Sequence, residues 1–179
     1  KGIGQYVARH PHYQMLFGPV SISNAYNEFS QGLLATWLQM HTFLPELAQF
    51  IRPKNPMRVT PHQSQDLQRA LAGTRGVEEI SALLADVDPE QKGMPILLKQ
   101  YLKLGGKLLG FNRDALFNNA LDGLILVDLL QTPHQVLQRY MGKEGLTDFL
   151  RYHSPPHPSA GVKQPAPKPR HWAQTGLIG

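Results

Sequence analysis

The stretch Leu121-Asp-Gly-Leu-Ile-Leu-Val-Asp-Leu129 is mostly apolar on both faces, which predicts a strand covered inside a sheet. A second strand is predicted just upstream, from Lys107 to Asn112. Farther upstream, Tyr13 to Ser23 combines an apolar run with β-branched residues, and predicts another buried strand. Gly18-Pro19 interrupts that run and suggests a bulge or bend, because a central strand tolerates proline poorly.

Most of the remaining apolar residues recur at helical spacing. Residues 52–64 contain three prolines and are predicted to form a loop. The predicted helices are Ile3 to about Arg9, a long helix capped by Ser23 or Asn24 and split at Pro45, Val77 to Val87, one from Pro95 to Gly105-Gly106, one capped by Thr132, and a last short one after Gly142. Helices mixed with few strands predict an α/β or α+β layer fold. Sheets commonly have about 4–6 strands, so further strands are expected upstream of Lys1.

Composition divides the chain into two parts. Residues 1–153 have the apolar content of one domain, whereas residues 154–179 form a proline-rich basic tail that is expected to be disordered. The net charge of +5 reflects this tail, because residues 151–179 contain four basic residues and no acidic one. The chain has no cysteine, and no apolar run reaches the roughly 18 residues of a membrane span.

Three stretches together resemble one family. They are Gly18 to Tyr26, Pro95 to Asn112, and Leu121 to Asp128 followed by Arg139 to Gly145. Their order and spacing are similar to those of the GNAT-like N-acyltransferase domain of bacterial ornithine-lipid synthases and hemolysin proteins. The resemblance covers roughly residues 1–153. It implies a partial GNAT-like mixed sheet flanked by helices, with the first strands and the glycine-rich donor-binding turn upstream of Lys1.

The resemblance also implies a function. A fatty acyl group, typically 3-hydroxyacyl, would pass from acyl carrier protein to an amino acid amine such as that of ornithine, in membrane lipid biosynthesis. The co-substrate would be acyl carrier protein or acyl-CoA, with no further cofactor and no nucleic-acid partner. The expected location is cytoplasmic, with at most peripheral contact with the inner membrane. Two alternatives are an acyl-homoserine-lactone-synthase-like transfer and a non-catalytic folded fragment that acts as an interaction module.

The donor side of the expected site lies around the first predicted strand. Ser21 and Ser23 share one face of it, and either could contact the donor or protonate the leaving thiolate. The resemblance implies that Asn24 and Tyr26 lie where the donor arm would pass. The alternative is that Ser23 or Asn24 only caps the next helix and Tyr26 packs in the core.

The acceptor side is expected at the later strands. Asp122 and Asp128 have the same inward parity, six residues apart, and either could bind a cationic amino acid or act as a base. Asp122 is the expected catalytic base, and Asp128 with Asn112 is expected to bind the acceptor. Alternatively, all three are strand-end residues in water. The eight histidines include no His-Glu-x-x-His pair, and no metal site is predicted.

Overall fold

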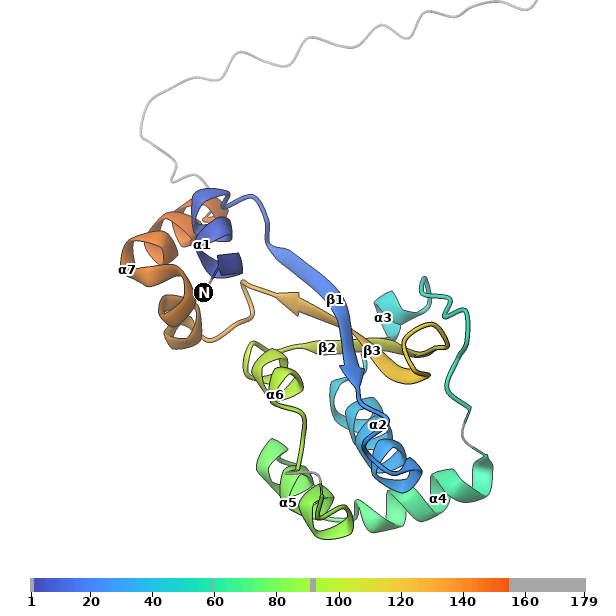
Figure 1. Cartoon of the computed structure of the whole chain (residues 1–179). Helices are drawn as coiled ribbons and strands as arrows, with labels where there is room; N and C mark the ends of the chain where they lie inside the picture. The colour runs from blue at the N-terminus through green and yellow to red at the C-terminus, as the bar shows by residue number, and fades with distance from the viewer. Residues whose placement is uncertain (1, 59, 91–92, 155–179) are drawn as a thin grey trace, which may run out of the picture.

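The computed structural model describes residues 2–58, 60–90 and 93–154. The helices and strands are α1 (Gly2–Arg9), β1 (Met15–Ile22), α2 (Glu28–Thr42), α3 (Pro45–Ala48), α4 (Pro61–Ala70), α5 (Val77–Val87), α6 (Ile96–Lys103), β2 (Lys107–Asp114), β3 (Ala120–Asp128) and α7 (His134–His153), as shown in Figure 1. The predicted disordered tail, apart from Ser154, lies outside the described residues.

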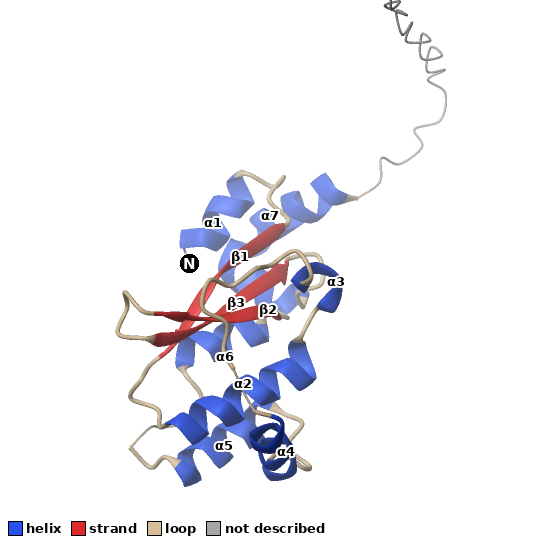
Figure 2. Ribbon diagram, turned by 90° about the vertical axis from the view of Figure 1, so that its right-hand side faces the viewer, coloured by secondary structure: helices blue, strands red, loops and turns tan. Residues whose placement is uncertain are grey.

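The three strands form one antiparallel sheet in the order β1-β3-β2, with β3 in the middle. Helices α2, α4 and α5 gather on one side of this sheet, while α1 and α7 lie side by side at its end (Figures 1 and 2). Segregated helices beside an antiparallel sheet define an α+β architecture. Of the two predicted classes, α/β and α+β, the structure has the second. The expected mixed sheet is not observed, because both strand pairings in the described residues are antiparallel.

Of the predicted bulge or bend at Gly18-Pro19, the bulge is wrong, because β1 pairs with β3 in continuous register through both residues. Proline is accommodated because β1 is an edge strand of the described sheet, where a missing N–H donor need not break a ladder. The bulge lies instead in β2, between Leu108 and Gly110. The prediction that β1 is a buried strand is also wrong for one face, since Phe17 is 76% exposed.

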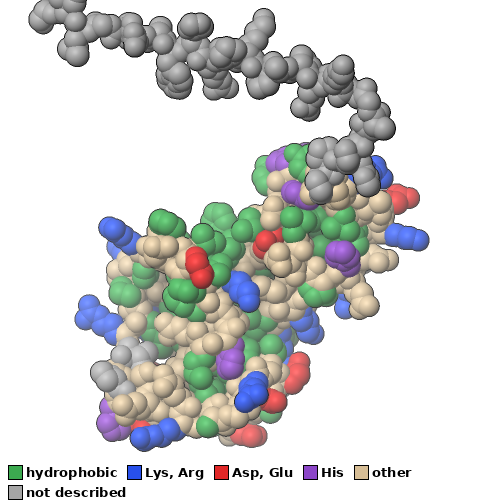
Figure 3. Space-filling view, turned by 180° about the vertical axis from the view of Figure 1, so that it is seen from behind, with side chains coloured by type: hydrophobic (Ala, Val, Ile, Leu, Met, Phe, Trp, Pro, Cys, Tyr) green, Lys and Arg blue, Asp and Glu red, His purple; other side chains and the backbone are tan. Residues whose placement is uncertain are grey.

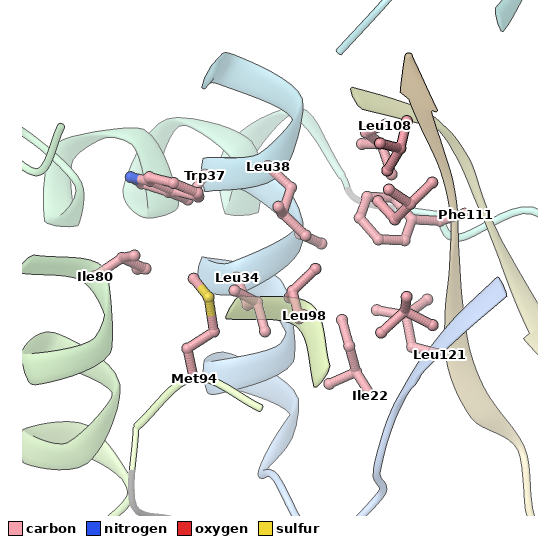
Figure 4. Packing of buried hydrophobic residues seen from close by; sticks show 14 of the residues in the cluster. Ile22, Leu34, Trp37, Leu38, Ile80, Met94, Leu98, Leu108, Phe111 and Leu121 are labelled. Carbon is pink, nitrogen blue, oxygen red and sulfur yellow. The ribbon is translucent and has the colours of Figure 1, made fainter. Parts of the chain in front are cut away.

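The core lies between the sheet and α2 (Figure 4). Leu34 and Leu38 point from α2 toward the sheet, where they meet Ile22 of β1, Leu121 of β3 and Phe111 of β2. All five side chains are buried. On β3 the odd-numbered residues from Leu121 to Val127 face this core, so the even-numbered residues face the opposite side of the sheet.

Two predictions about helix caps need correction. The residue that caps α2 is Asn27, whose Oδ1 accepts from the Ser30 N–H at 2.8 Å, and not Ser23 or Asn24. Thr132 does not cap α7; its hydroxyl donates to the carbonyl of Leu104 at 2.6 Å. Both predictions place the cap before the actual helix start, which depends on where the preceding turn ends. The predicted break at Pro45 is confirmed.

Helix α4 was missed, because its first residues fall in the proline-rich segment predicted as a loop. Thr60 and Gln63 nevertheless form a capping box there: the Gln63 N–H donates to the Thr60 hydroxyl, and the Thr60 N–H donates to Gln63 Oε1. Pro61 occupies the first turn, where its missing donor has no cost. The capping signal outweighs the proline content at this position.

Helices α1 and α7 pack closely because each contributes a glycine at its contact with the other. A Cβ atom added to Gly4 would lie 2.7 Å from the Tyr140 Cβ, and one added to Gly145 would lie 2.7 Å from the Ala8 Cβ. Such distances leave no room for a side chain. Gly142 has φ of +82° and divides α7 into two helical segments, as the sequence predicts.

Replacing Glu79 with Gln is expected to destabilise the protein at neutral pH but not in acid. The backbone N–H groups of Gly76 and Arg75 donate to Glu79 Oε2 at 3.1 and 2.6 Å, and hold the pKa of this exposed carboxyl below its ordinary value of 4.5. A carboxyl with a lowered folded pKa stabilises above its unfolded pKa and loses that contribution as pH falls through the folded pKa. Thermal unfolding midpoints of wild type and Glu79→Gln should therefore converge in acid.

The matched control for this experiment is Glu78→Gln. Glu78 is the preceding residue, and its exposed carboxylate contacts the ammonium group of the half-buried Lys99 at 3.4 Å rather than a backbone N–H. Exposed ion pairs contribute little, so this variant should change the midpoint less at neutral pH. A Glu79→Gln deficit that stays constant into acid would show that the charge of Glu79 does not stabilise α5.

Candidate active site

Three of the expected site residues lie side by side across the sheet. In the strand register, Ser21 of β1 is opposite Asp122 of β3, and Asp122 is opposite Asn112 of β2. The Ser21 hydroxyl donates to Asp122 Oδ1 at 2.6 Å, although 101 residues separate the two in sequence. We call Ser21, Asp122 and Asn112 the polar row. It brings together a residue expected on the donor side and two expected on the acceptor side.

Strand alternation places the polar row on the face of the sheet away from α2. The neighbours Ile22, Leu121 and Phe111 are buried in the core, and successive side chains on a strand point to opposite faces. Asp122 and Asn112 are half-buried, whereas Ser21 is exposed. The expectation that Asp122 points inward is therefore wrong, and its carboxylate can be approached from outside.

Asn112 is held by a loop that crosses the end of β2. Its Oδ1 accepts from the Asn55 N–H at 2.8 Å, and the Asn55 side chain donates to the Arg113 carbonyl at 3.1 Å. Because the oxygen of the Asn112 amide is engaged, its amide nitrogen remains as a donor beside Asp122. No other hydrogen bond of this side chain occurs within the described residues.

Ser23 and Asn24 lie in the turn between β1 and α2 and do not join the polar row. The Ser23 hydroxyl accepts from the Ala25 N–H at 3.1 Å, which shapes the turn. The Asn24 side chain donates to the carbonyl of Asn118, in the hairpin between β2 and β3. Asn118 and Asn119 both have positive φ, so this contact fastens a tight hairpin close to the polar row.

Gln31 of α2, which was not expected at the site, holds this turn by hydrogen bonds to its backbone carbonyls. It is 3% exposed on α2, and its Nε2 lies 3.2 Å from the Tyr26 carbonyl and 3.3 Å from the Ser23 carbonyl. Its Oε1 accepts from Arg113 at 3.3 Å. A glutamine among the apolar residues of α2 is the sequence signal that could have identified it, because buried amides need partners.

Tyr26 is a core residue rather than a donor-binding one. Its side chain is 8% exposed, and its hydroxyl donates to the Gly93 carbonyl at 2.6 Å. Burial, and then the negative charge of Asp88, raise the pKa of Tyr26 above its ordinary value of 10.0, so the phenol stays protonated and remains a donor. The alternative that Tyr26 packs is the one that the structure supports.

Replacing Tyr26 with Phe is therefore expected to reduce the free energy of unfolding by about 1–3 kcal/mol, because the Gly93 carbonyl would lose its buried partner. Urea unfolding at equilibrium measures the change. Tyr152→Phe is the control, since Tyr152 is 58% exposed and should lose almost nothing. Equal stability of the two variants would contradict a structural role for the Tyr26 hydroxyl.

Asp128 does not lie with Asp122, contrary to the expectation of a shared acceptor site. They lie six positions apart along the strand, which corresponds to about 20 Å. Asp128 Oδ1 accepts from the Gln14 side chain and from the Leu130 N–H, both at 3.0 Å. Its hydrogen bonds shape the turn after β3 and tie it to the segment before β1.

The surface shows no single concentration of positive charge on the side seen in Figure 3, where Lys and Arg side chains project mostly from the periphery and hydrophobic side chains appear at several places. Among residues 2–58, 60–90 and 93–154, no group of three or more His, Asp or Glu side chains could hold a metal ion. Within the same part of the chain, no helix is both long enough and apolar enough to cross a membrane.

The fold and the polar row define an α+β protein whose antiparallel sheet presents a hydrogen-bonded serine and carboxylate on its outer face. No protein-family model, no curated protein and no solved structure matches the chain.

Proposed function

We propose that this chain acts in N-acyl transfer, moving a (3-hydroxy)fatty acyl group from acyl carrier protein to the amine of an amino acid such as ornithine, for membrane lipid synthesis. The proposal is supported by the polar row. Its Ser21–Asp122 hydrogen bond of 2.6 Å joins, on an accessible face, two of the three residues that the sequence predicts as catalytic.

The reaction requires balanced movement of two protons. The protonated amine first loses one proton, and its nitrogen then attacks the thioester carbonyl carbon. The C–N bond forms, the C–S bond breaks, and the nitrogen loses its second proton. The departing thiolate takes up one proton, and the other is released to water. The site therefore needs one group that accepts protons from the nitrogen and another that donates a proton to the leaving sulfur.

Asp122 is proposed as the proton acceptor. Ser21 binds its Oδ1, and within the described part of the chain no hydrogen bond engages Oδ2. That free oxygen can bind an ammonium group and take its proton as the nitrogen attacks. Ser21 is exposed and hydrogen-bonded to the same carboxylate, so it is the group placed to protonate the leaving sulfur.

Asn112 is proposed to select the acceptor. Its amide nitrogen lies in the row beside Asp122, while its oxygen is held by the Asn55 N–H. An amino acid carries a carboxylate next to its amine. A carboxylate acceptor and an amide donor side by side complement those two groups, which supports an amino acid over a simple alkyl amine as the acceptor.

The proposal is tested by incubating the full chain with 3-hydroxyacyl carrier protein and ornithine, and following both N-acyl-ornithine by mass spectrometry and the free carrier thiol. Equal yields of amide and thiol are expected. Product with S-adenosylmethionine in place of ornithine would favour the homoserine-lactone type of transfer instead. Absence of amide with every amine would contradict acyl transfer by this chain and favour the interaction module.

A further inference from the structure

An apolar groove of about 500 Å³ lies between α6 and the α1–α7 helix pair. Its floor is formed by Leu16 and Leu129, at the ends of β1 and β3 that are nearest to α1 and α7 in Figure 1. Ile3 and Leu97 line it from α1 and α6, and Leu137 lines it from α7. The groove is thus built from three separate parts of the chain: α1 with β1, α6, and the segment from the end of β3 into α7.

The groove lies where the closely packed α1–α7 pair stands beside α6. Gly4 allows α1 to approach the backbone of α7 so closely that no side chain fits between them. Ile3 of α1 and Leu97 of α6 line the space that remains between these helices. Ile3 and Leu97 remain 65% and 56% exposed, which is unusual for two apolar residues that line one concave surface.

The chemistry of the wall restricts what can bind. None of the described residues that line the groove is charged. The polar side chains include Tyr140 and Gln100, and the Tyr140 hydroxyl donates to Gln100 Oε1 at 3.2 Å. A nucleotide or a free amino acid would bring charges that this wall cannot pair. A hydrocarbon chain with one oxygen-bearing position fits the wall.

We propose that this groove binds a single fatty acyl chain. Its volume falls within the roughly 300–1,000 Å³ of sites for small ligands. A protein partner would need about 800 Å² on each side, far more than so short a groove presents. The amide nitrogen of Gln100 is not engaged by any described residue, and can donate to the oxygen of the chain.

This site is separate from the polar row. Leu16 lies five residues from Ser21 along β1 and faces the opposite side of the sheet, so a chain in the groove does not occupy Asp122. The groove is therefore a second acyl site, suited to holding the tail of a lipid or fatty acid while the polar row is free. Binding there does not depend on whether acyl transfer occurs.

The test is direct binding of cis-parinaric acid to the full chain, followed by fluorescence, with displacement by saturated fatty acids of increasing length. Affinity should rise by up to about fourfold for each added methylene until the groove is full, and then level off. Leu97→Asp places a charge at the rim and should weaken binding at least about tenfold.

Ile96→Asp is the matched control. Ile96 is the preceding residue of α6, is 79% exposed and does not line the groove. The fatty-acid affinity of the Ile96→Asp variant should therefore stay within about twofold of wild type. Should Leu97→Asp unfold, Ile3→Asp on the opposite wall repeats the test at another exposed site. Equal weakening by Leu97→Asp and Ile96→Asp, or an affinity independent of chain length, would overturn the proposal.

The binding experiment and the acyl-transfer experiment can contradict their two proposals independently of each other. Chain-length-dependent binding that Leu97→Asp removes, without any amide product, would support the groove and contradict the proposed transferase. Amide formation, together with fatty-acid binding that Leu97→Asp leaves unchanged, would support the transferase and contradict acyl binding in the groove.

Discussion

Replacing Asp122 with Asn should lower the rate of amide formation by about 10²–10⁴-fold, the range expected when a positioned general base is removed. Asn keeps the shape of the side chain and can still accept the hydrogen bond from Ser21, so the fold is expected to survive. It cannot take a proton from the attacking nitrogen. Initial rates of N-acyl-ornithine formation, together with thermal unfolding of the same sample, measure the two effects separately.

Asp128→Asn is the matched control for this variant. It makes the same change on the same strand and face, six residues away and outside the polar row. Its hydrogen bonds to Gln14 and Leu130 can be kept by the Asn oxygen, so the rate should stay close to that of wild type. Equal loss in both variants would indicate a general electrostatic effect, and an unchanged rate in Asp122→Asn would remove Asp122 from the mechanism.

Replacing Leu34 with Ala should reduce the free energy of unfolding by about 2–5 kcal/mol. Leu34 is fully buried on α2, where it points between Met94 and Leu98 toward the sheet (Figure 4). Truncation removes apolar contacts and leaves a cavity that the surrounding helices can fill only in part. Chemical denaturation should show a lower midpoint with an unchanged slope, because the extent of unfolding is the same.

Met40→Ala serves as the comparison for Leu34→Ala. Met40 lies on the same helix but is 51% exposed, so its truncation should cost under about 1 kcal/mol. The difference between the two variants isolates the contribution of burial against the sheet from that of helix propensity. A Leu34→Ala midpoint as high as that of Met40→Ala would show that α2 is not packed as the structure describes.

Prediction from sequence succeeded where a local signal and the final structure agree. The strands at Lys107 and Leu121 and the break at Pro45 follow from apolar runs and proline. It failed at α4, where a capping box at Thr60 is stronger than a high proline content. It also failed at Gly18-Pro19, because whether a strand lies at an edge depends on its neighbours and not on its own residues.

The candidate site shows the same division. The parity of Ser21 and Asp122 could be read from alternation along each strand, but not which face would be the outer one. The pairing of Ser21 with Asp122 and of Asp122 with Asn112 is a property of strand register. Asp128 has the same parity as Asp122 yet lies at the other end of β3, where it shapes a turn.

The sequence by itself therefore determined that helices combine with a few strands, where the three strands lie, and which residue types are available for chemistry, because these follow from local periodicity. Only the tertiary structure decided that β3 lies between β1 and β2, that the polar row faces outward, and that a groove opens beside α6. Each of these depends on contacts between residues far apart in the chain. Burial of the apolar face of the sheet against α2 selects among such contacts, and no single segment encodes that selection.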